Sequence, residues 1–300
     1  MPLSALLITL AAAFLHAGWN VLLGTARDAE AATAVAFLAG ATAFLPIAVL
    51  TWDADADAVP YMAASCALEL AYLALLGRAY ATGSVAVVYP VARGSAPVIV
   101  LLVTTLALGV ALGAREVVAV ALVAGGVLAV RGLGREARPR DAILGLAIAV
   151  SIAGYTIVDD HGLDHAGALG YLEVVTGIPA VFYAVWIARR RGLPFALRAR
   201  NSTGATRVLN GIAAHSRGAT GLRAELTPRT LAAGLAAFGA YGLVLLALER
   251  AEAAPVAAVR ESSVVIVVLV AAAMGRERLT AARLGGAVAI VLGVVVLALP

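Results

Sequence analysis

Long apolar segments follow one another along almost the whole chain, and each runs for 17 to 24 residues. A helix of that length can cross the hydrocarbon core of a bilayer, which is about 30 Å thick. Because lipid offers no hydrogen-bond partners, the backbone amides must be paired within each segment, which favours helices. Of the 300 residues, 62% are hydrophobic and 13% are charged, and no soluble domain of this size has that composition. The sequence therefore predicts an all-α polytopic membrane protein.

The pattern predicts ten transmembrane helices. They are expected at residues 3–23, 31–51, 59–80, 85–108, 115–131, 142–158, 166–188, 231–248, 253–274 and 279–299. The first segment lacks the basic stretch and the cleavage site of a signal peptide, so we expect it to remain in place as a helix.

The 22 basic residues are all arginines, and they give the chain a net charge of +4. Eighteen of them lie on the side reached after odd-numbered segments, and two lie on the opposite side. Since cytoplasmic connections are enriched in arginine, this bias predicts that both termini face away from the cytoplasm. We expect a multi-pass protein of the plasma (inner) membrane. The positive charge reflects topology, and no nucleic-acid partner is expected.

The chain also repeats itself. Residues 93–101 (RGSAPVIVL) match residues 260–268 (RESSVVIVV) at five of nine positions, 167 residues apart. Residues 13–20 match residues 149–156 at a separation of 136, and the 31 extra residues fit the long basic connection at 189–229. Five crossings per half give the two halves opposite orientations, as in secondary transporters. We therefore predict two inverted five-helix repeats, at residues 1–131 and 141–300.

Three stretches resemble one family of membrane carriers. They are HAGWN at residues 16–20, YPVARGSAP at residues 89–97, and the ending from ALERAEAAPVAAVRESS through MGRERLTAARLGGAVAIVLGVVVL. Over nearly its whole length the chain resembles the EamA-like branch of the drug/metabolite transporter superfamily. The family's Gly-Glu-Arg-Leu turn is matched at residues 275–279 with one inserted arginine, whereas the first half at 109–116 has drifted. The resemblance implies a ten-helix carrier of small metabolites, often an exporter.

A few ionisable side chains interrupt the apolar segments, and such residues mark transport pathways or buried pairs. They are His16, Glu69, Arg93, Glu173, Arg260 and Glu261. Arg93 and Arg260 occupy equivalent places in the two repeats, so both are expected near a central cavity. The planar guanidinium group suits a carboxylate, which favours an amino acid or a small organic anion as the solute. An ion pair between Glu69 and Arg93 is the alternative.

Polar and aromatic side chains near these charges complete the predicted substrate site. His16 and Asn20 lie one helical turn apart beside Trp19, and they either line the cavity or join helices by hydrogen bonds. Tyr89 and Tyr155 are the predicted aromatic contacts. Tyr171 and Tyr241 are further candidates, or else interfacial anchors.

Transport is expected to be driven by exchange or by an ion, because the chain has no Walker A motif for ATP. Glu173 has no evident partner, so it is the first predicted proton carrier. Glu261 is the second, and its side chain points about 100° away from that of Arg260. The partners expected are thus a small solute, the lipid bilayer and a coupling proton.

The alternative classes are a membrane-embedded enzyme and a structural membrane protein. Cys66 is the only cysteine, which excludes an internal disulfide and a thiolate metal cage. Asp53 to Asp57 and the residues from Asp159 to His165 resemble metal ligands, but both are expected to be solvated turns. The 189–229 connection either contacts anionic lipid or is a solvated insertion. We expect no catalytic activity, cofactor or metal.

Overall fold

The computed structural model describes residues 1–23, 26–82, 85–111, 113–131, 139–191, 222–273 and 280–298, and all the regular structure in these ranges is helical. Polar side chains start two of the helices. The Asp28 carboxylate accepts a hydrogen bond from Ala31 N at the start of α2, and the Thr227 hydroxyl accepts one from Thr230 N at the start of α11. These caps satisfy backbone amides that have no partner in the first turn.

The helices follow the predicted order. They are α1 (Leu3–Leu23), α2 (Ala29–Leu50), α3 (Ala58–Thr82), α4 (Val85–Leu106), α5 (Ala114–Arg131), α6 (Pro139–Gly162), α7 (Ala168–Leu172), the π-helix η1 (Glu173–Gly177), α8 (Ile178–Arg191), α11 (Pro228–Leu248), α12 (Ala253–Arg260), α13 (Ser263–Ala273) and α14 (Ala281–Ala298). Within the described ranges, seven helical segments are long and apolar enough to cross a membrane, and two shorter apolar helices accompany them. The chain is an integral multi-pass membrane protein.

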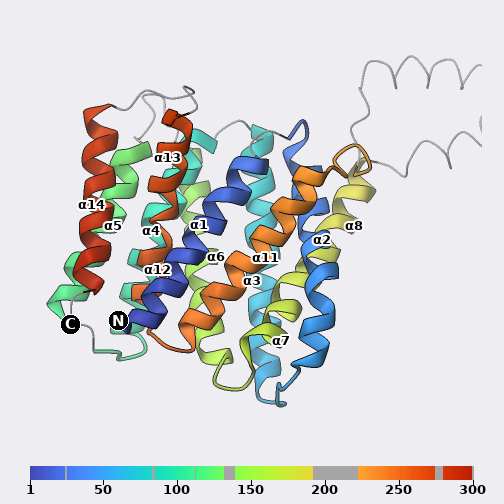
Figure 1. Cartoon of the computed structure of the whole chain (residues 1–300), viewed down its shortest axis with the longest axis horizontal. Helices are drawn as coiled ribbons and strands as arrows, with labels where there is room; N and C mark the ends of the chain where they lie inside the picture. The colour runs from blue at the N-terminus through green and yellow to red at the C-terminus, as the bar shows by residue number, and fades with distance from the viewer. Residues whose placement is uncertain are drawn as a thin grey trace, which may run out of the picture.

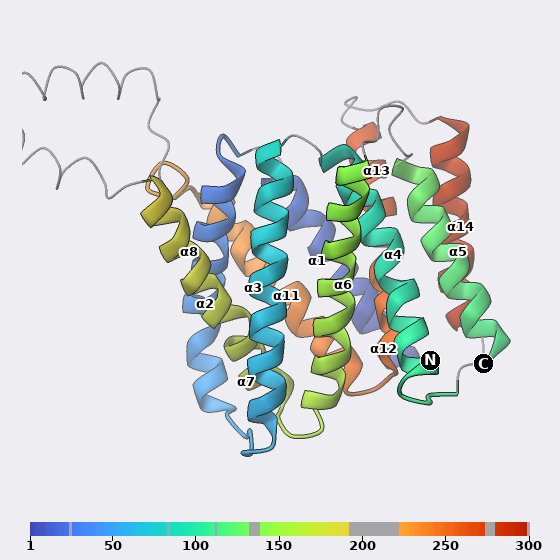
Figure 2. The same ribbon diagram turned by 180° about the vertical axis from the view of Figure 1, so that it is seen from behind.

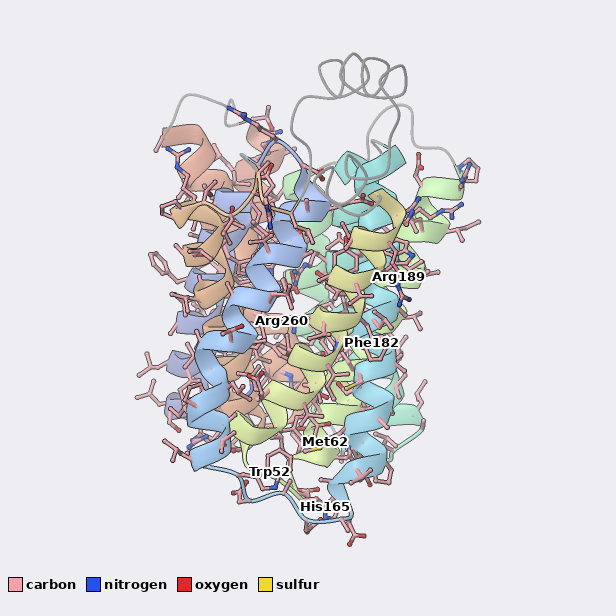
Figure 3. All side chains as sticks on the ribbon, turned by 90° about the vertical axis from the view of Figure 1, so that its right-hand side faces the viewer. Trp52, Met62, His165, Phe182, Arg189 and Arg260 are labelled. Atoms are coloured by element: carbon pink, nitrogen blue, oxygen red, sulfur yellow. The ribbon has the colours of Figure 1, made fainter. Side chains whose placement is uncertain are left out.

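The helices stand roughly side by side, and both termini lie at the same end of the molecule (Figure 1). At one edge α5 packs against α14, and at the other α2 packs against α8 (Figures 1 and 2). Between these edges α1 crosses α11, and α6 lies against both α3 and α4. The outer surface carries large apolar side chains such as Phe14, Leu50 and Phe182, the last of which is labelled in Figure 3. These side chains face the region that lipid would occupy.

The ninth helical segment is broken, so the prediction of one continuous helix at 253–274 is wrong. α12 ends at Arg260, and α13 begins at Ser263. Between them the amides of Glu261 and Ser262 bond to carbonyls three residues earlier, and the amides of Val264 and Val265 do the same. These tighter turns interrupt the α-helix at the buried charges.

The sixth and seventh segments also differ from prediction. α6 continues to Gly162, four residues beyond the expected end at 158, and this places Asp159 and Asp160 inside the helix. The seventh segment contains a π-turn over Glu173–Gly177, a wider turn that is common at functional sites. The residues between Asp159 and His165 are therefore only partly a solvated turn.

Candidate functional site

A cavity with about 530 Å³ of space free of protein atoms lies among α1, α3, α4, α6, α11 and α12. Its walls combine two arginines, a glutamate, a histidine and aromatic rings. The lining residues are Ala12, His16, Trp19, Phe37, Glu69, Tyr72, Arg93, Tyr155, Thr176, Ala237, Ala240, Tyr241, Val244 and Arg260. Figure 3 shows Arg260 about midway between the end with Trp52 and His165 and the end near Arg189. The cavity therefore lies near the middle of the helices.

One side of the cavity is built around two arginines that share a carboxylate. Arg93 Nη1 lies 3.3 Å from Glu261 Oε1, and Arg260 Nε lies 3.8 Å from the same oxygen. All three side chains are at most 5% exposed. Glu261 therefore neutralises part of the positive charge of this wall. The predicted pair between Glu69 and Arg93 does not form, because Arg93 turns to Glu261 at the helix break instead.

His16 links the arginine wall to α1. Its Nε2 lies 2.5 Å from Arg93 Nη2, and its Nδ1 lies 3.3 Å from Trp19 Nε1. Arginine and tryptophan are both donors, whereas a neutral imidazole has one acceptor nitrogen. When Nε2 accepts from Arg93, Nδ1 carries the proton and cannot accept from Trp19. This corner of the cavity thus has more donors than acceptors.

Buried polar atoms without partners also lie at Arg260. Its buried Nε has no hydrogen-bond partner among the described residues, and neither has Oε2 of Glu261. Arg260 itself lines the cavity. A buried guanidinium group with unused donors is a favourable place for an anion.

Glu69 of α3 lies on the wall of the same cavity and is only 5% exposed. It forms no ion pair or hydrogen bond with a described residue. The cavity therefore presents guanidinium groups on α4 and α12 and a separate carboxyl group on α3.

Aromatic rings form the remaining wall. Tyr155 makes edge contacts with both Tyr72 and Tyr241, with ring centroids 6.2 Å and 5.7 Å apart. Trp19 makes a similar contact with Phe37. Rings in this arrangement pack firmly and give this side of the cavity an aromatic wall.

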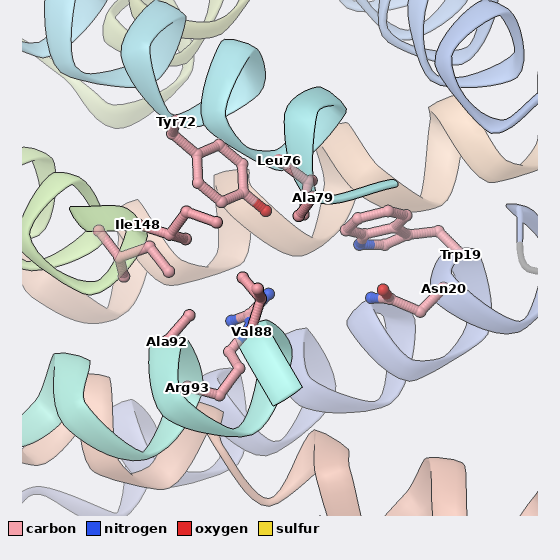
Figure 4. A pocket seen from close by; sticks show the side chains of 10 residues that line it. Trp19, Asn20, Tyr72, Leu76, Ala79, Val88, Ala92, Arg93 and Ile148 are labelled. Atoms are coloured by element: carbon pink, nitrogen blue, oxygen red, sulfur yellow. The ribbon is translucent and has the colours of Figure 1, made fainter. Parts of the chain in front are cut away.

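A second, much narrower cavity adjoins the first, because both include Trp19, Tyr72 and Arg93 in their walls. Figure 4 shows these side chains pointing toward a common space, with Asn20 beside Trp19. The wall continues to Ala79 and Val88, near the connection between α3 and α4. The two cavities together run from the middle of the helices toward this end.

At the opposite end the sequence analysis missed a buried carboxylate, that of Asp159. Its side chain is 0% exposed, and Oδ1 accepts a hydrogen bond from the Tyr171 hydroxyl at 3.1 Å. Oδ2 accepts one from the Tyr241 hydroxyl. The signal that could have revealed it is the four-residue spacing of Tyr155 and Asp159, which puts both on one face of α6.

The remaining predicted residues have different places. His16, Trp19, Tyr155 and Arg260 lie on the wall of the first cavity, and Asn20 lies on that of the second, where its Nδ2 donates to His16 O. Glu173 and Glu261 line neither of these two cavities. The half-buried Glu173 has an Oε2 without a hydrogen-bond partner in the described part of the chain.

Three expectations fall wholly or partly outside the described residues. The side chain of Tyr89 is one of them, although its backbone belongs to α4. The others are the Gly-Glu-Arg-Leu turn at 275–279 and most of the basic connection at 189–229.

The acidic run after α2 is exposed, but it also holds the loop after α6. Asp53 Oδ1 accepts a hydrogen bond from Gly167 N, and Asp55 accepts bonds from Asp57 N and Ala58 N. Ligand atoms of Asp55, Asp57 and His165 lie within 4.8 Å of one another. Exposed acidic groups often gather without an ion, so this cluster carries no metal assignment.

A multi-pass membrane protein with a buried, charged cavity at mid-height is the class that this fold and site define. A family model, the EamA-like transporter family, matches residues 140–299, and the chain belongs to that family, which is part of the drug/metabolite transporter superfamily. Members of the family are transporters of small molecules.

The comparison with solved structures supports the fold alone. A structure described as "Crystal structure of protein" has a TM-score of 0.70 to this chain at 16% sequence identity. The match covers 99% of this chain and 96% of that one. No curated protein matches the chain significantly.

Proposed function

We propose that the chain is a secondary transporter with ten membrane crossings in two inverted repeats, at residues 1–131 and 141–300. Its cavity binds a small metabolite with a carboxylate, either an amino acid or a small organic anion. Coupling to a proton or another ion, or exchange of solutes, drives the movement. Export is the direction that the family resemblance favours.

The pairing of helices supports the inverted repeat. If α1 to α5 correspond to α6, α7–α8, α11, α12–α13 and α14, most of the large contacts have a symmetric counterpart. The contact of α1 with α11 corresponds to that of α6 with α3, and the contact of α4 with α6 corresponds to that of α12 and α13 with α1. The pairs α5–α14, α2–α8 and α4–α12 map onto themselves. A two-fold axis between the halves produces this pattern.

The same symmetry holds for single residues where α5 meets α14. A β-carbon on Gly126 would lie 2.6 Å from Gly286 O, and one on Gly293 would lie 2.7 Å from Ala119 O. Gly126 and Gly293 are 167 residues apart, as are Ala119 and Gly286. This is also the separation of Arg93 and Arg260. The same separation in the sequence therefore relates the two buried arginines and the two close contacts between α5 and α14.

The unpartnered Nε of Arg260 on the cavity wall is the observation that carries the substrate class. A carboxylate in the cavity would accept from the guanidinium groups and from Trp19 Nε1, which His16 cannot satisfy together with Arg93. Glu69, on α3, suits the ammonium group of an amino acid. The aromatic wall suits an apolar side chain.

The test is counterflow in proteoliposomes with a panel of radiolabelled amino acids and the matching 2-oxo acids, which lack the ammonium group. Uptake of at least one member, lost when unlabelled solute is absent inside, supports the proposal. Glu69→Gln should weaken exchange of the amino acid more than that of its 2-oxo acid. If no carboxylate exchanges while uncharged or cationic solutes do, the substrate class is wrong.

A further inference from the structure

Asp159 is buried between phenol hydroxyls, and it has no cation as a direct partner. Its two oxygens accept from Tyr171 on α7 and Tyr241 on α11, and the buried Ser65 of α3 is close by. No arginine or histidine within the described ranges forms an ion pair with it. An ionised carboxylate in such a place costs several kcal/mol, unless it is compensated or takes up a proton.

The hydroxyl partners are compatible with both states of the group. A tyrosine hydroxyl can donate to a carboxylate, and its oxygen can also accept from a protonated carboxyl group. Arginine offers only donors, so a carboxylate between arginines is held in its ionised form. The surroundings of Asp159 therefore allow a proton to bind and leave without an unpaired buried group.

Tyr241 connects Asp159 directly with the cavity. It donates to Asp159 Oδ2, and it also lies on the cavity wall beside Tyr155. Glu69, on the same wall, is one helical turn from Ser65 on α3. A solute in the cavity would thus touch two groups that respond to the charge of Asp159.

On its other side Asp159 is covered by one aromatic ring. The Tyr171 ring lies against Gly162, where a β-carbon would come within 2.5 Å of the hydroxyl oxygen. Beyond Gly162 the chain enters the exposed turn that contains Asp164. The fully buried Tyr171 ring thus lies next to both Asp159 and the last residue of α6 before this turn.

Titratable and charged groups surround Asp159 on every packed element. They are Cys66 and Glu69 on α3, Tyr155 and Asp160 on α6, Tyr171 on α7, Tyr241 on α11 and Arg260 on α12. Arg260 is the one cation in this set, and its ion pair is with Glu261. In this set, Glu69 and Asp160 are the carboxyl groups near Asp159, and its direct partners are neutral hydroxyls.

We propose that Asp159 is the site that binds and releases the coupling proton, and that Tyr241 transmits its state to the solute cavity. This inference rests on the proposed transport function. A hydronium ion from the water phase transfers one proton to the Asp159 carboxylate, so one O–H bond of the hydronium ion breaks as the O–H bond of the carboxylic acid forms, and water is left. The Tyr241 hydroxyl is then free to turn from Asp159 toward a solute.

The proton can be observed without any substrate. Infrared difference spectra of the reconstituted protein, recorded as the pH is changed, report protonated carboxyl groups. Asp159→Asn should lose one pH-dependent carboxyl component, whereas the control Asp164→Asn, in the exposed turn, should keep it. An unchanged spectrum in Asp159→Asn would overturn the proposal.

Transport then tests coupling separately. Proteoliposomes loaded with the amino acid found by counterflow are compared with and without a proton gradient. Asp159→Asn should lose gradient-driven accumulation and keep exchange, and the control Asp164→Asn should keep both. Accumulation that persists in Asp159→Asn overturns the role of Asp159 but leaves the transporter intact. If the wild type shows no exchange, the proposed transport function is contradicted instead. The infrared spectra still decide whether Asp159 binds and releases a proton.

A well-folded variant is needed for this comparison. Asparagine has the shape of aspartate, and its amide can bond to both phenols, so Asp159→Asn should fold. If its yield falls, Tyr241→Phe removes one partner and leaves the carboxyl group in place. Its carboxyl component should shift to another pH range, and an unshifted component would also overturn the proposal.

Discussion

Two carboxylates, Glu261 and Asp159, are completely buried in this protein, and their surroundings are opposite. Glu261 lies between two arginines at the break between α12 and α13. Asp159 lies between two tyrosines near the end of α6. The solute cavity separates them, with Arg260 and Tyr241 on its walls. One cavity thus has a neighbouring carboxylate that is paired with arginines and another that is bonded to hydroxyls.

The difference separates two roles of a buried carboxylate, charge balance and proton exchange, which the sequence alone does not distinguish. A carboxylate next to arginines balances their charge and holds them in place, so removing it leaves cations unpaired in the interior. A carboxylate next to hydroxyls does not balance the charge of a neighbouring cation, and it is better suited to exchange a proton. We therefore assign the larger effect on folding to Glu261 and the larger effect on coupling to Asp159.

Glu261→Gln should have the largest effect on stability. Breaking a buried ion pair by removing one partner costs about 3–5 kcal/mol, so the variant should show a lower Tm and a lower folded yield in detergent. Glu252→Gln is the matched control, since Glu252 is exposed just before α12. Thermal unfolding of both variants checks this. Equal Tm values for the two variants would contradict the structural role of Glu261.

Substitution of Arg93 should have the next largest effect, and it acts on binding. A hydrogen bond to a charged group contributes about 1.5–3 kcal/mol, so Arg93→Ala should weaken binding of a carboxylate solute about ten-fold to a hundred-fold. Arg93→Lys should recover only part of this, because an ammonium group cannot form the paired contacts of a guanidinium group. Binding titrations of the two variants measure the loss.

The control for Arg93 is Arg115→Ala. Arg115 is 39% exposed at the start of α5, where it pairs with Glu116. It should leave binding unchanged. If both Arg93 variants keep full affinity for every anion that the wild type binds, Arg93 serves only as the partner of Glu261, and an anionic solute is excluded.

The two tyrosines that donate to Asp159 allow the role of each hydrogen bond to be compared. Tyr171→Phe and Tyr241→Phe each remove one hydrogen bond, worth about 1 kcal/mol, so their Tm values should fall by similar amounts. Tyr171→Phe should shift the pH range over which solute binding changes. Only Tyr241 also reaches the cavity, so only Tyr241→Phe should make solute binding less dependent on pH. Binding curves at several pH values compare the variants. Identical pH profiles would mean that Tyr241 does not transmit the state of Asp159.

Much of the helix order could be predicted because lipid demands long apolar segments, and their ends stand out in the sequence. The arginines could be predicted for the same reason, since a charge inside such a segment is rare. The partner of Arg93 could not. Glu69 and Glu261 were both available, and neither proline nor glycine signals the turn at 261–262 that brings Glu261 to Arg93.

Asp159 was missed for a related reason. It follows the apolar segment directly and precedes Asp160 and His161, a pattern that reads as the start of a polar loop. The helix continues there because α7 and α11 cover it and supply the hydroxyls of Tyr171 and Tyr241. Such long-range contacts have no local signal in the sequence.

Asn20→Ala should have the smallest effect, and it tests how far the arginine side of the cavity extends along α1. The Asn20 amide donates to the carbonyl of His16 in its own helix, so its loss should cost at most about 1 kcal/mol of stability. Because Asn20 lines the second cavity beside Trp19, the loss should appear as a two-fold to five-fold weaker affinity, roughly 0.5–1 kcal/mol, with normal folded yield. His16→Ala should weaken affinity more, since His16 contacts Arg93 itself. Measuring yield and affinity for both variants separates the two roles. A fall in yield without a selective change in affinity would mean that these residues join helices, and the solute site would then end at Arg93.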